Sequence, residues 1–227
     1  MTLLFEIKEL TGGYFDTNVV FDVSARIDHG TVLGIFGRNG AGKSTLAKLA
    51  NGSLQPSGGQ ILLDERPIGR LPAHRRRELG IGFMPQDSMV FDNLSVRENL
   101  YIGSIGESPE LFIDRFPLIA RRLDQLAGTM SGGERKILSF VRSMIEDTRL
   151  VILDEPSEGV QSENIDLMAC CVKERVASGA GIMIIEQNLR FLASIADHFL
   201  GLDAGRTIYS EASSKSSESE IRAILAL

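Results

Sequence analysis

The stretch GRNGAGKS, residues 37–44, decides the fold. It fits the pattern G-x-x-x-x-G-K-[ST]; the apolar run TVLGIFG leads into it, and a helix-like segment follows that stops at Asn51-Gly52. The glycines let backbone N–H groups turn towards a polyphosphate, and the helix dipole adds a favourable field for an anion. We therefore predict a phosphate-binding loop, in which Lys43 reaches the β- and γ-phosphates and the Ser44 hydroxyl helps to hold Mg²⁺. The flanking strand and helix disfavour the alternative, an accidental glycine-rich turn.

Apolar runs typical of buried strands alternate with helix-like segments along the chain. LLFEIKEL and VVFDVSARID indicate two strands, separated by a Gly12-Gly13 turn and the pair Tyr14-Phe15. TVLGIFG is almost wholly apolar, as a strand covered on both faces is, and GIGFMPQ, LVILDE and GIMIIEQ indicate further strands. This alternation predicts an α/β core with a mainly parallel sheet, whose ligand crevice lies at the carboxyl ends of the strands. Those ends carry Gly37, Gln86, Asp154 and Gln187.

The remaining segments are expected to be helical or to form a closing hairpin. The segment from about Ser95 to Leu126 has helical spacing and few strand signals, which indicates a helical insert. SGGERKILSFVRSMIED, SENIDLMACCVKERVASG and NLRFLASIA are predicted helices, and HFLGLDAGRTIYS a hairpin-like pair of strands. The tail EASSKSSESEIRAILAL is predicted to be a solvated connector to a short terminal helix that packs on the domain.

Composition narrows the classes of function. The chain has 227 residues, 43% of them hydrophobic, enough for one compact domain. A net charge of −6, with Lys and Arg scattered along the chain, argues against a nucleic-acid-binding face. No run approaches the about 18 apolar residues of a membrane span, and no secretory signal is visible. The adjacent Cys170 and Cys171, interpreted as helix core, then favour a reducing cytosol.

A second motif carries two carboxylates. In RLVILDEP, apolar residues lead directly to Asp154 and Glu155. In a nucleotide hydrolase the first carboxylate can bind Mg²⁺, and the second can orient and deprotonate the attacking water. Two adjacent acids before a proline are often merely a turn, but beside a phosphate-binding loop they complete a catalytic set.

A third motif, MSGGE at residues 130–134, precedes a predicted helix. Ser131 and Glu134 fit a capping box, which is a purely structural interpretation. Capping alone does not require Gly132 and Gly133. Two glycines at a helix start also expose backbone N–H groups, an arrangement that receives a phosphate.

GRNGAGKST, Gln86 in FMPQ, MSGGE and VILDEP, in this order and spacing, resemble the ATP-binding subunit of ABC transporters. The match runs from about Phe5 to Ser210. The resemblance implies a single ABC ATP-binding domain over residues 1–227. A P-loop core with an N-terminal antiparallel β-subdomain would occupy 1–86 and 149–210, a helical subdomain with the signature motif MSGGE 87–148, and a C-terminal tail 211–227.

The resemblance also implies Mg²⁺-dependent ATP hydrolysis and a set of site residues. Tyr14 would stack on adenine, with Phe15 as the alternative if the turn shifts by one residue, and packing at the turn as the structural alternative. The implied phosphate-binding residues are Gly37, Arg38, Asn39, Gly40, Ala41, Gly42, Lys43, Ser44 and Thr45. The implied Mg²⁺-binding residues are Ser44, Gln86 and Asp154, and the implied catalytic residues are Glu155, Gln86 and Gln187. Ser131, Gly132 and Gly133 would contact the γ-phosphate of ATP held by the opposite subunit, so a complete site needs two chains, head to tail.

The chain departs from the family pattern at two places. Most ABC ATPases have a histidine where this chain has Gln187, and an amide cannot carry charge or shuttle a proton as an imidazole does. After VILDEP, the stretch SEGVQ, residues 157–161, stands where many members carry a small-residue and Leu-Asp motif; we expect Ser157 and Glu158 at the dimer interface. For the histidines we expect no catalytic role: His29 at a turn, His74 on a basic solvated face and His198 at a strand edge.

LAGTMSGGE, LDEPSEGV and IIEQN look like the subfamily that serves branched-chain amino acids, related hydrophobic amino acids or urea. This likeness implies uptake, permease subunits as partners, a second and different ABC ATPase subunit, and indirectly a solute-binding protein. It also implies a peripheral position at the cytoplasmic face of a bacterial or archaeal membrane. One alternative is an importer of urea or another small solute, and another is a soluble ABC ATPase. A DNA-repair ATPase would need a long coiled coil between the phosphate loop and MSGGE, for which the spacing leaves no room. A translation factor would normally carry two cassettes, and this sequence contains one.

Overall fold

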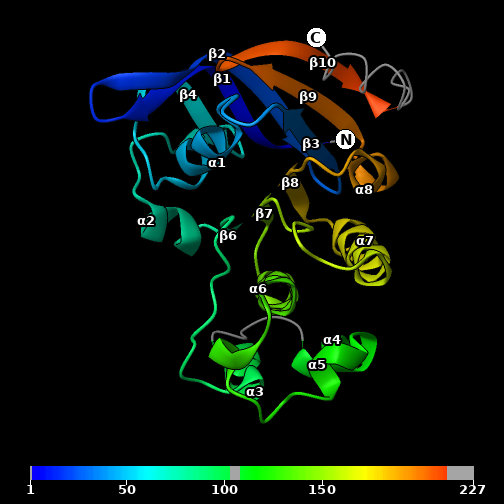
Figure 1. Cartoon of the computed structure of the whole chain (residues 1–227). Helices are drawn as coiled ribbons and strands as arrows, with labels where there is room; N and C mark the ends of the chain where they lie inside the picture. Colours follow the sequence, from blue (N-terminus) through cyan, green and yellow to red (C-terminus); the bar gives the residue numbers. More distant parts are fainter. Residues whose placement is uncertain (1, 103–107, 214–227) are drawn as a thin grey trace.

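The computed structural model describes residues 2–102 and 108–213 (Figure 1). The predicted C-terminal helix lies outside these residues. The described elements are, in chain order, β1 (Leu3–Tyr14), β2 (Thr17–Asp28), β3 (Val32–Gly37), α1 (Lys43–Asn51), β4 (Pro56–Leu63), β5 (Arg66–Pro67), α2 (Ala73–Glu78), β6 (Ile81–Met84), α3 (Val96–Tyr101), α4 (Pro109–Arg115), α5 (Pro117–Ala120), a 3₁₀ turn (Ala127–Thr129), α6 (Gly132–Ile145), β7 (Leu150–Asp154), α7 (Ser162–Ala177), β8 (Gly181–Ile185), α8 (Leu189–Ile195), β9 (His198–Asp203) and β10 (Arg206–Ala212).

A mainly parallel sheet forms the core, in the order β10-β9-β3-β8-β7-β6. Only β10, the second strand of the predicted hairpin, pairs antiparallel within this sheet. Every residue of β3, β7 and β8 is buried, because helices or a second sheet cover both faces. Alternate residues of β3 enter different cores: Val32 packs with α6, α7 and α8, whereas Leu33 packs with β1, β2 and α1. The α/β prediction is confirmed.

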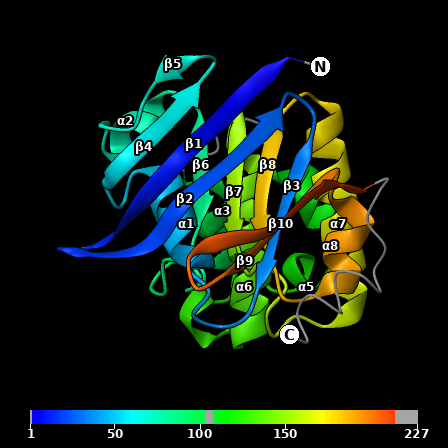
Figure 2. The ribbon, with the colours of Figure 1, turned by 90° about the horizontal axis from the view of Figure 1, so that it is seen from above.

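A four-stranded antiparallel sheet, in the order β2-β1-β4-β5, covers one face of the parallel sheet (Figure 2). The pairing of Tyr14 with Thr17 puts the β1–β2 turn at residues 15–16, so the predicted turn at Gly12-Gly13 is wrong. These glycines lie inside β1, where the register with β2 shifts repeatedly. A Cβ atom at Gly13 would come 2.1 Å from the Thr17 carbonyl oxygen, so glycine serves a close backbone approach rather than a turn.

The segment after β6 is helical, as predicted, but in short pieces. In Figure 1, α3, α4 and α5 lie at the end of the molecule opposite β1 and β2, with α6 between them and the sheet. A capping box of Ser95 and Glu98 begins α3, and Pro109 and Pro117 occupy the first turns of α4 and α5. Proline has no N–H to donate, so it is favourable at a helix start and unfavourable further in, which keeps these helices separate.

The basic face expected around His74, which lies in the stretch HRRRE (residues 74–78), is only partly solvated. His74 is exposed on α2, but Arg76 is fully buried. Its guanidinium donates to the carbonyl oxygens of Leu49 and Ala50 at the end of α1, at 2.7 and 2.8 Å. It also donates to the carbonyls of Gly69 and Leu71. Burial lowers the pKa of Arg76 to about 10, and the four carbonyls explain why a buried cation is tolerated.

Two smaller expectations have mixed outcomes. Cys171 is buried in α7, but Cys170 is exposed, because adjacent residues of a helix point about 100° apart. The helix-core interpretation is therefore wrong for Cys170. Within residues 2–102 and 108–213, the helices are all too short or too polar to span a membrane.

Candidate active site

A cavity of about 400 Å³ at the carboxyl ends of the parallel strands gathers most of the predicted site residues. It is lined by Tyr14, Val19, Asn39, Gly40, Gly42, Lys43, Ser44, Thr45, Gln86, Glu155, Glu158 and Gln187. Gly37, Arg38 and Ala41 belong to the same loop, and Asp154 lies next to Ser44. The histidines at positions 29, 74 and 198 do not line the cavity.

The loop between β3 and α1 has the geometry of an anion-binding turn. Gly40 and Gly42 have φ angles of 81° and 96°, which favour glycine, and α1 begins directly after them at Lys43. The Lys43 side chain is buried, and its Nζ donates to the carbonyl oxygens of Gly37 and Arg38, both at 3.0 Å. Burial lowers the pKa of Lys43, an effect that nearby carboxylates oppose. The loop thus places a helix N-terminus and a cation at one point.

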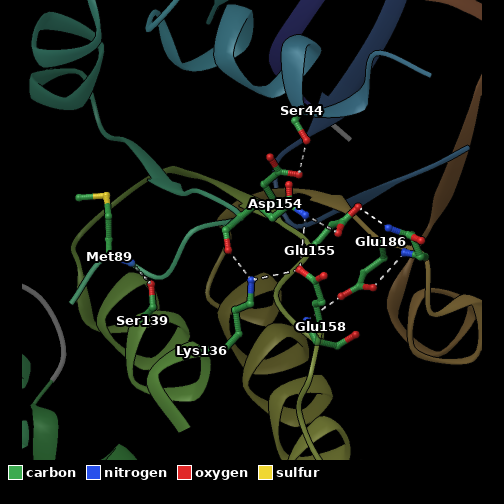
Figure 3. Close-up of polar contacts among 11 residues, drawn as sticks. Ser44, Met89, Lys136, Ser139, Asp154, Glu155, Glu158 and Glu186 are labelled. Carbon is green, nitrogen blue, oxygen red and sulfur yellow. Dashed lines mark hydrogen bonds and ion pairs between the residues drawn. The ribbon is translucent and has the colours of Figure 1, made fainter. Parts of the chain in front are cut away.

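Ser44 and Asp154 meet at the base of this loop (Figure 3). The Ser44 hydroxyl donates to Asp154 Oδ1 at 3.2 Å. Asp154 is only 1% exposed; burial raises its pKa, and the bond from Ser44 opposes the rise. In the described part of the chain, there is no cluster of three or more His, Cys, Asp or Glu that could hold a metal. One hydroxyl and one carboxylate fit Mg²⁺, which usually takes its other ligands from substrate phosphates and water.

Glu155 lies between two amide side chains. The Nε2 atoms of Gln86 and Gln187 donate to its two carboxylate oxygens, at 3.0 and 2.7 Å. Glu155 is only 5% exposed. Its φ angle is 50°, a backbone conformation that is unfavourable for residues other than glycine. The three strand ends from which these residues come are neighbours in the sheet, so their side chains converge. The arrangement fixes one carboxylate in a single orientation beside the loop.

Glu186 is a site residue that the sequence analysis did not identify. It is 2% exposed, and its Oε1 accepts the Ser157 N–H at 2.8 Å. Its Oε2 accepts the N–H groups of Gln187 and Asn188, at 3.0 and 3.1 Å. Burial raises the pKa of Glu186, and these bonds oppose the rise. Glu186 thereby joins the turn after β7 to the turn after β8; the signal was a carboxylate ending a wholly apolar strand.

Ser157 and Glu158, both expected at the dimer interface, differ in exposure. Ser157 is buried beneath the turn after β7, whereas Glu158 is exposed. Their place at a dimer interface stays a prediction.

The two aromatic candidates lie in different environments. Tyr14 is 38% exposed and lines the cavity; its hydroxyl accepts a hydrogen bond from Lys48 Nζ at 3.2 Å. Phe15 lies at the tip of the β1–β2 turn, fully exposed, with a φ of 51°. Tyr14 is therefore the aromatic side chain placed near the loop.

The MSGGE motif begins α6 and lies apart from the loop. Ser131 and Glu134 form the predicted capping box. Ser131 and Gly133 line a second cavity, of about 460 Å³, which the loop does not reach. A Cβ atom at Gly133 would come 2.3 Å from the Gly159 carbonyl oxygen, whereas one at Gly132 would meet no atom within 4 Å. Packing within one chain therefore requires glycine at position 133, whereas a side chain at position 132 would meet no other atom of the chain.

Comparisons with known proteins agree with this architecture. The family model described as ABC transporter matches residues 20–158. The chain is 32% identical over 209 residues to the probable branched-chain amino acid transport ATP-binding protein LivF of Archaeoglobus fulgidus, covering 88% of this chain and 89% of that protein. It is 30% identical over 217 residues to the lipopolysaccharide export system ATP-binding protein LptB of Acidithiobacillus ferridurans, covering 92% and 90%.

A solved structure of an ATP-binding subunit of an ABC transporter has a TM-score of 0.83 to this chain, at 27% identity, with 99% of this chain and 100% of that chain covered. The chain belongs to the ABC transporter family. It is an ATP-hydrolysing subunit, and subunits of this kind work with transmembrane permease components.

Proposed function

We propose that this chain powers the uptake of branched-chain or other hydrophobic amino acids through a membrane permease. The observation that carries the proposal is the glutamine at position 187. It lies in the stretch IIEQN, which resembles this subfamily, and its amide donates a hydrogen bond to the Glu155 carboxylate. The similarity to LivF supports it, as does 31% identity over 202 residues to the high-affinity branched-chain amino acid transport ATP-binding protein BraG of Pseudomonas aeruginosa. A second candidate is lipopolysaccharide export, favoured by the 30% identity to LptB.

The loop residues 37–45 bind the phosphates of ATP, and Tyr14 stacks on adenine. Ser44, Asp154 and Gln86 would hold Mg²⁺, and the ion would neutralise charge on the phosphates. The support is the 3.2 Å contact between the Ser44 hydroxyl and the Asp154 carboxylate, which brings two suitable oxygen ligands together.

Glu155 acts as the general base for the attacking water. Gln86 and Gln187 each donate a hydrogen bond to its carboxylate, which orients it towards the loop. Neither amide takes up a proton, so Glu155 accepts the proton itself. Gln187 supplies a donor at the place where, by the resemblance, most ABC ATPases have a histidine.

Two ATPase subunits complete each site across their interface. Ser131, Gly132 and Gly133 of one subunit contact the γ-phosphate held by the other, which is supported by their separation from the loop of their own chain. ATP then favours the closed dimer because it binds that state more tightly. We propose a heterodimer with a second ABC ATPase at the cytoplasmic face of a bacterial or archaeal membrane, and a solute-binding protein upstream of the permease.

A single introduced tryptophan tests the adenine site. The chain contains no tryptophan, so Tyr14→Trp adds the only indole. We expect ATP to change its fluorescence through stacking, and Tyr14→Ala to weaken ATP binding by about 1–3 kcal/mol, the range for base–aromatic stacking. Phe15→Trp, at the exposed turn, is the control and should not respond. A response at position 15 with none at position 14 would assign the stacking to Phe15.

Purification of the native membrane complex tests the transport proposal. We expect mass spectrometry to identify permease subunits, a second ABC ATPase and a solute-binding protein of the amino-acid type. A urea-type binding protein would redirect the solute, and lipopolysaccharide-export components would establish the second candidate. Sedimentation with ribosomes or DNA and no permease would contradict a role in transport.

A further inference from the structure

Helix α6 carries a row of polar side chains that hold the segment following β6. Lys136, Ser139 and Arg142 are spaced by three residues and therefore lie on one side of the helix. Lys136 Nζ donates to the carbonyl oxygen of Gln86. The Ser139 hydroxyl accepts the Met89 N–H at 3.2 Å (Figure 3). Arg142 donates to the Met89 carbonyl. Three successive polar residues on this side of α6 thus bind the main chain of the segment 86–89.

Lys136 differs from the other two because its contacts reach the active site. Its Nζ lies 3.8 Å from Glu158 Oε2, and the Gln86 side chain donates to both Glu155 and Glu158, at 3.0 and 3.4 Å. One ammonium group therefore holds Gln86 by its main chain while the amide of the same residue holds the Glu155 carboxylate. Figure 3 shows Lys136 pointing from α6 towards Glu155 and Glu158.

Packing alone does not explain a lysine at this position. The Lys136 residue is only 5% exposed, and the next residues of α6, Ile137 and Leu138, fill the apolar core. Removing an ammonium from water costs free energy unless hydrogen bonds and opposite charge replace the water. The Gln86 carbonyl and the Glu158 carboxylate are those replacements, and both belong to segments that line the nucleotide cavity.

We infer that Lys136 is a positioning residue for ATP hydrolysis: it fixes Gln86, and through Gln86 the orientation of Glu155. The inference rests on the proposed roles of Glu155 and Gln86. Because α6 begins beside Ser131, the helix that meets the partner's nucleotide at one end holds its own subunit's catalytic carboxylate through Lys136. Contact with a nucleotide at the signature motif is thereby coupled to the geometry of the other site.

The test compares Lys136→Met with Arg135→Met in the purified native complex. Arg135 is the neighbouring cation of the same helix, with a side chain 38% exposed and 3.8 Å from Asp92, so its loss is a matched control. We expect Lys136→Met to lower kcat by about 10- to 100-fold, the usual effect of losing a group that orients a reactive residue. ATP affinity, measured with a labelled nucleotide, should stay within about threefold, since the loop is untouched. Arg135→Met should retain near-normal kcat.

Lys136→Gln keeps a polar end group and replaces the methionine variant if that one does not fold. The same loss of kcat without loss of affinity is expected, because the shorter amide does not reach the Gln86 carbonyl as the ammonium does. A kcat within about twofold of the native value, or equal falls in kcat and affinity, would overturn the inference. A native complex without ATPase activity, or one indifferent to Glu155→Gln, would instead overturn the proposed function.

Discussion

Glu155→Gln should leave ATP binding intact and slow hydrolysis by about 10²- to 10⁴-fold, the contribution of a positioned general base. An amide has nearly the shape of the carboxylate but cannot take the proton of the attacking water. The neighbours of Glu155 are two amides, Gln86 and Gln187, which can turn to present oxygen instead of nitrogen. The substituted side chain therefore keeps hydrogen-bond partners, and folding is expected to survive.

Single-turnover hydrolysis and labelled-nucleotide binding, measured on the same preparation, separate these two effects. Glu78→Gln is the control: it is also a carboxylate-to-amide change, on α2, with a side chain 59% exposed and outside the nucleotide cavity. It should hydrolyse ATP at the native rate. Near-normal turnover by Glu155→Gln would remove Glu155 from the role of base.

Lys43→Ala should abolish tight ATP binding. In the structure the ammonium donates to two loop carbonyls, those of Gly37 and Arg38, which places it at the mouth of the loop. A phosphate oxygen is a stronger acceptor because it carries negative charge, and hydrogen bonds to charged groups contribute about 1.5–3 kcal/mol, or about 10- to 150-fold in affinity. The buried position, which lowers the pKa of Lys43, adds to the advantage of gaining an anionic partner.

Titration with a labelled nucleotide measures this loss directly. Lys173→Ala removes an exposed lysine from α7 and should bind ATP as the native chain does. The melting temperature of both variants should be compared, since Lys43 also supports the loop carbonyls. Unchanged ATP affinity in Lys43→Ala would contradict the phosphate-loop interpretation.

The convergence of the site could be predicted from the sequence because it depends on the sheet. Gln86, Glu155 and Gln187 follow three apolar runs, and parallel strands bring their carboxyl ends to one edge whatever the loops do. The phosphate loop was predictable for a different reason: its glycines and lysine are local requirements that appear in consecutive residues. Both signals lie in short stretches of sequence and can be recognised without knowing which distant residues are in contact.

The features that could not be predicted depend on such distant contacts. The turn at Gly12-Gly13 was misplaced because β1 pairs with β2 on one side and β4 on the other, and these pairings carry the strand through the glycines. Glu186 and Lys136 look like ordinary polar residues at a strand end and on a helix. Their roles appear only when the turn after β7 lies against Glu186 and the Gln86 carbonyl against Lys136.

The four carbonyls bound by Arg76 have a mechanical consequence for the whole subunit. In the proposed site, the nucleotide phosphates bind at the first turn of α1. Arg76 anchors the last turn of the same helix to α2 and to the segment 69–71. The helix cannot slide along its axis without breaking several hydrogen bonds at once. Force exerted on the phosphate loop therefore meets a stiff support, and we expect the displacement on closure to occur in α3 to α6 instead.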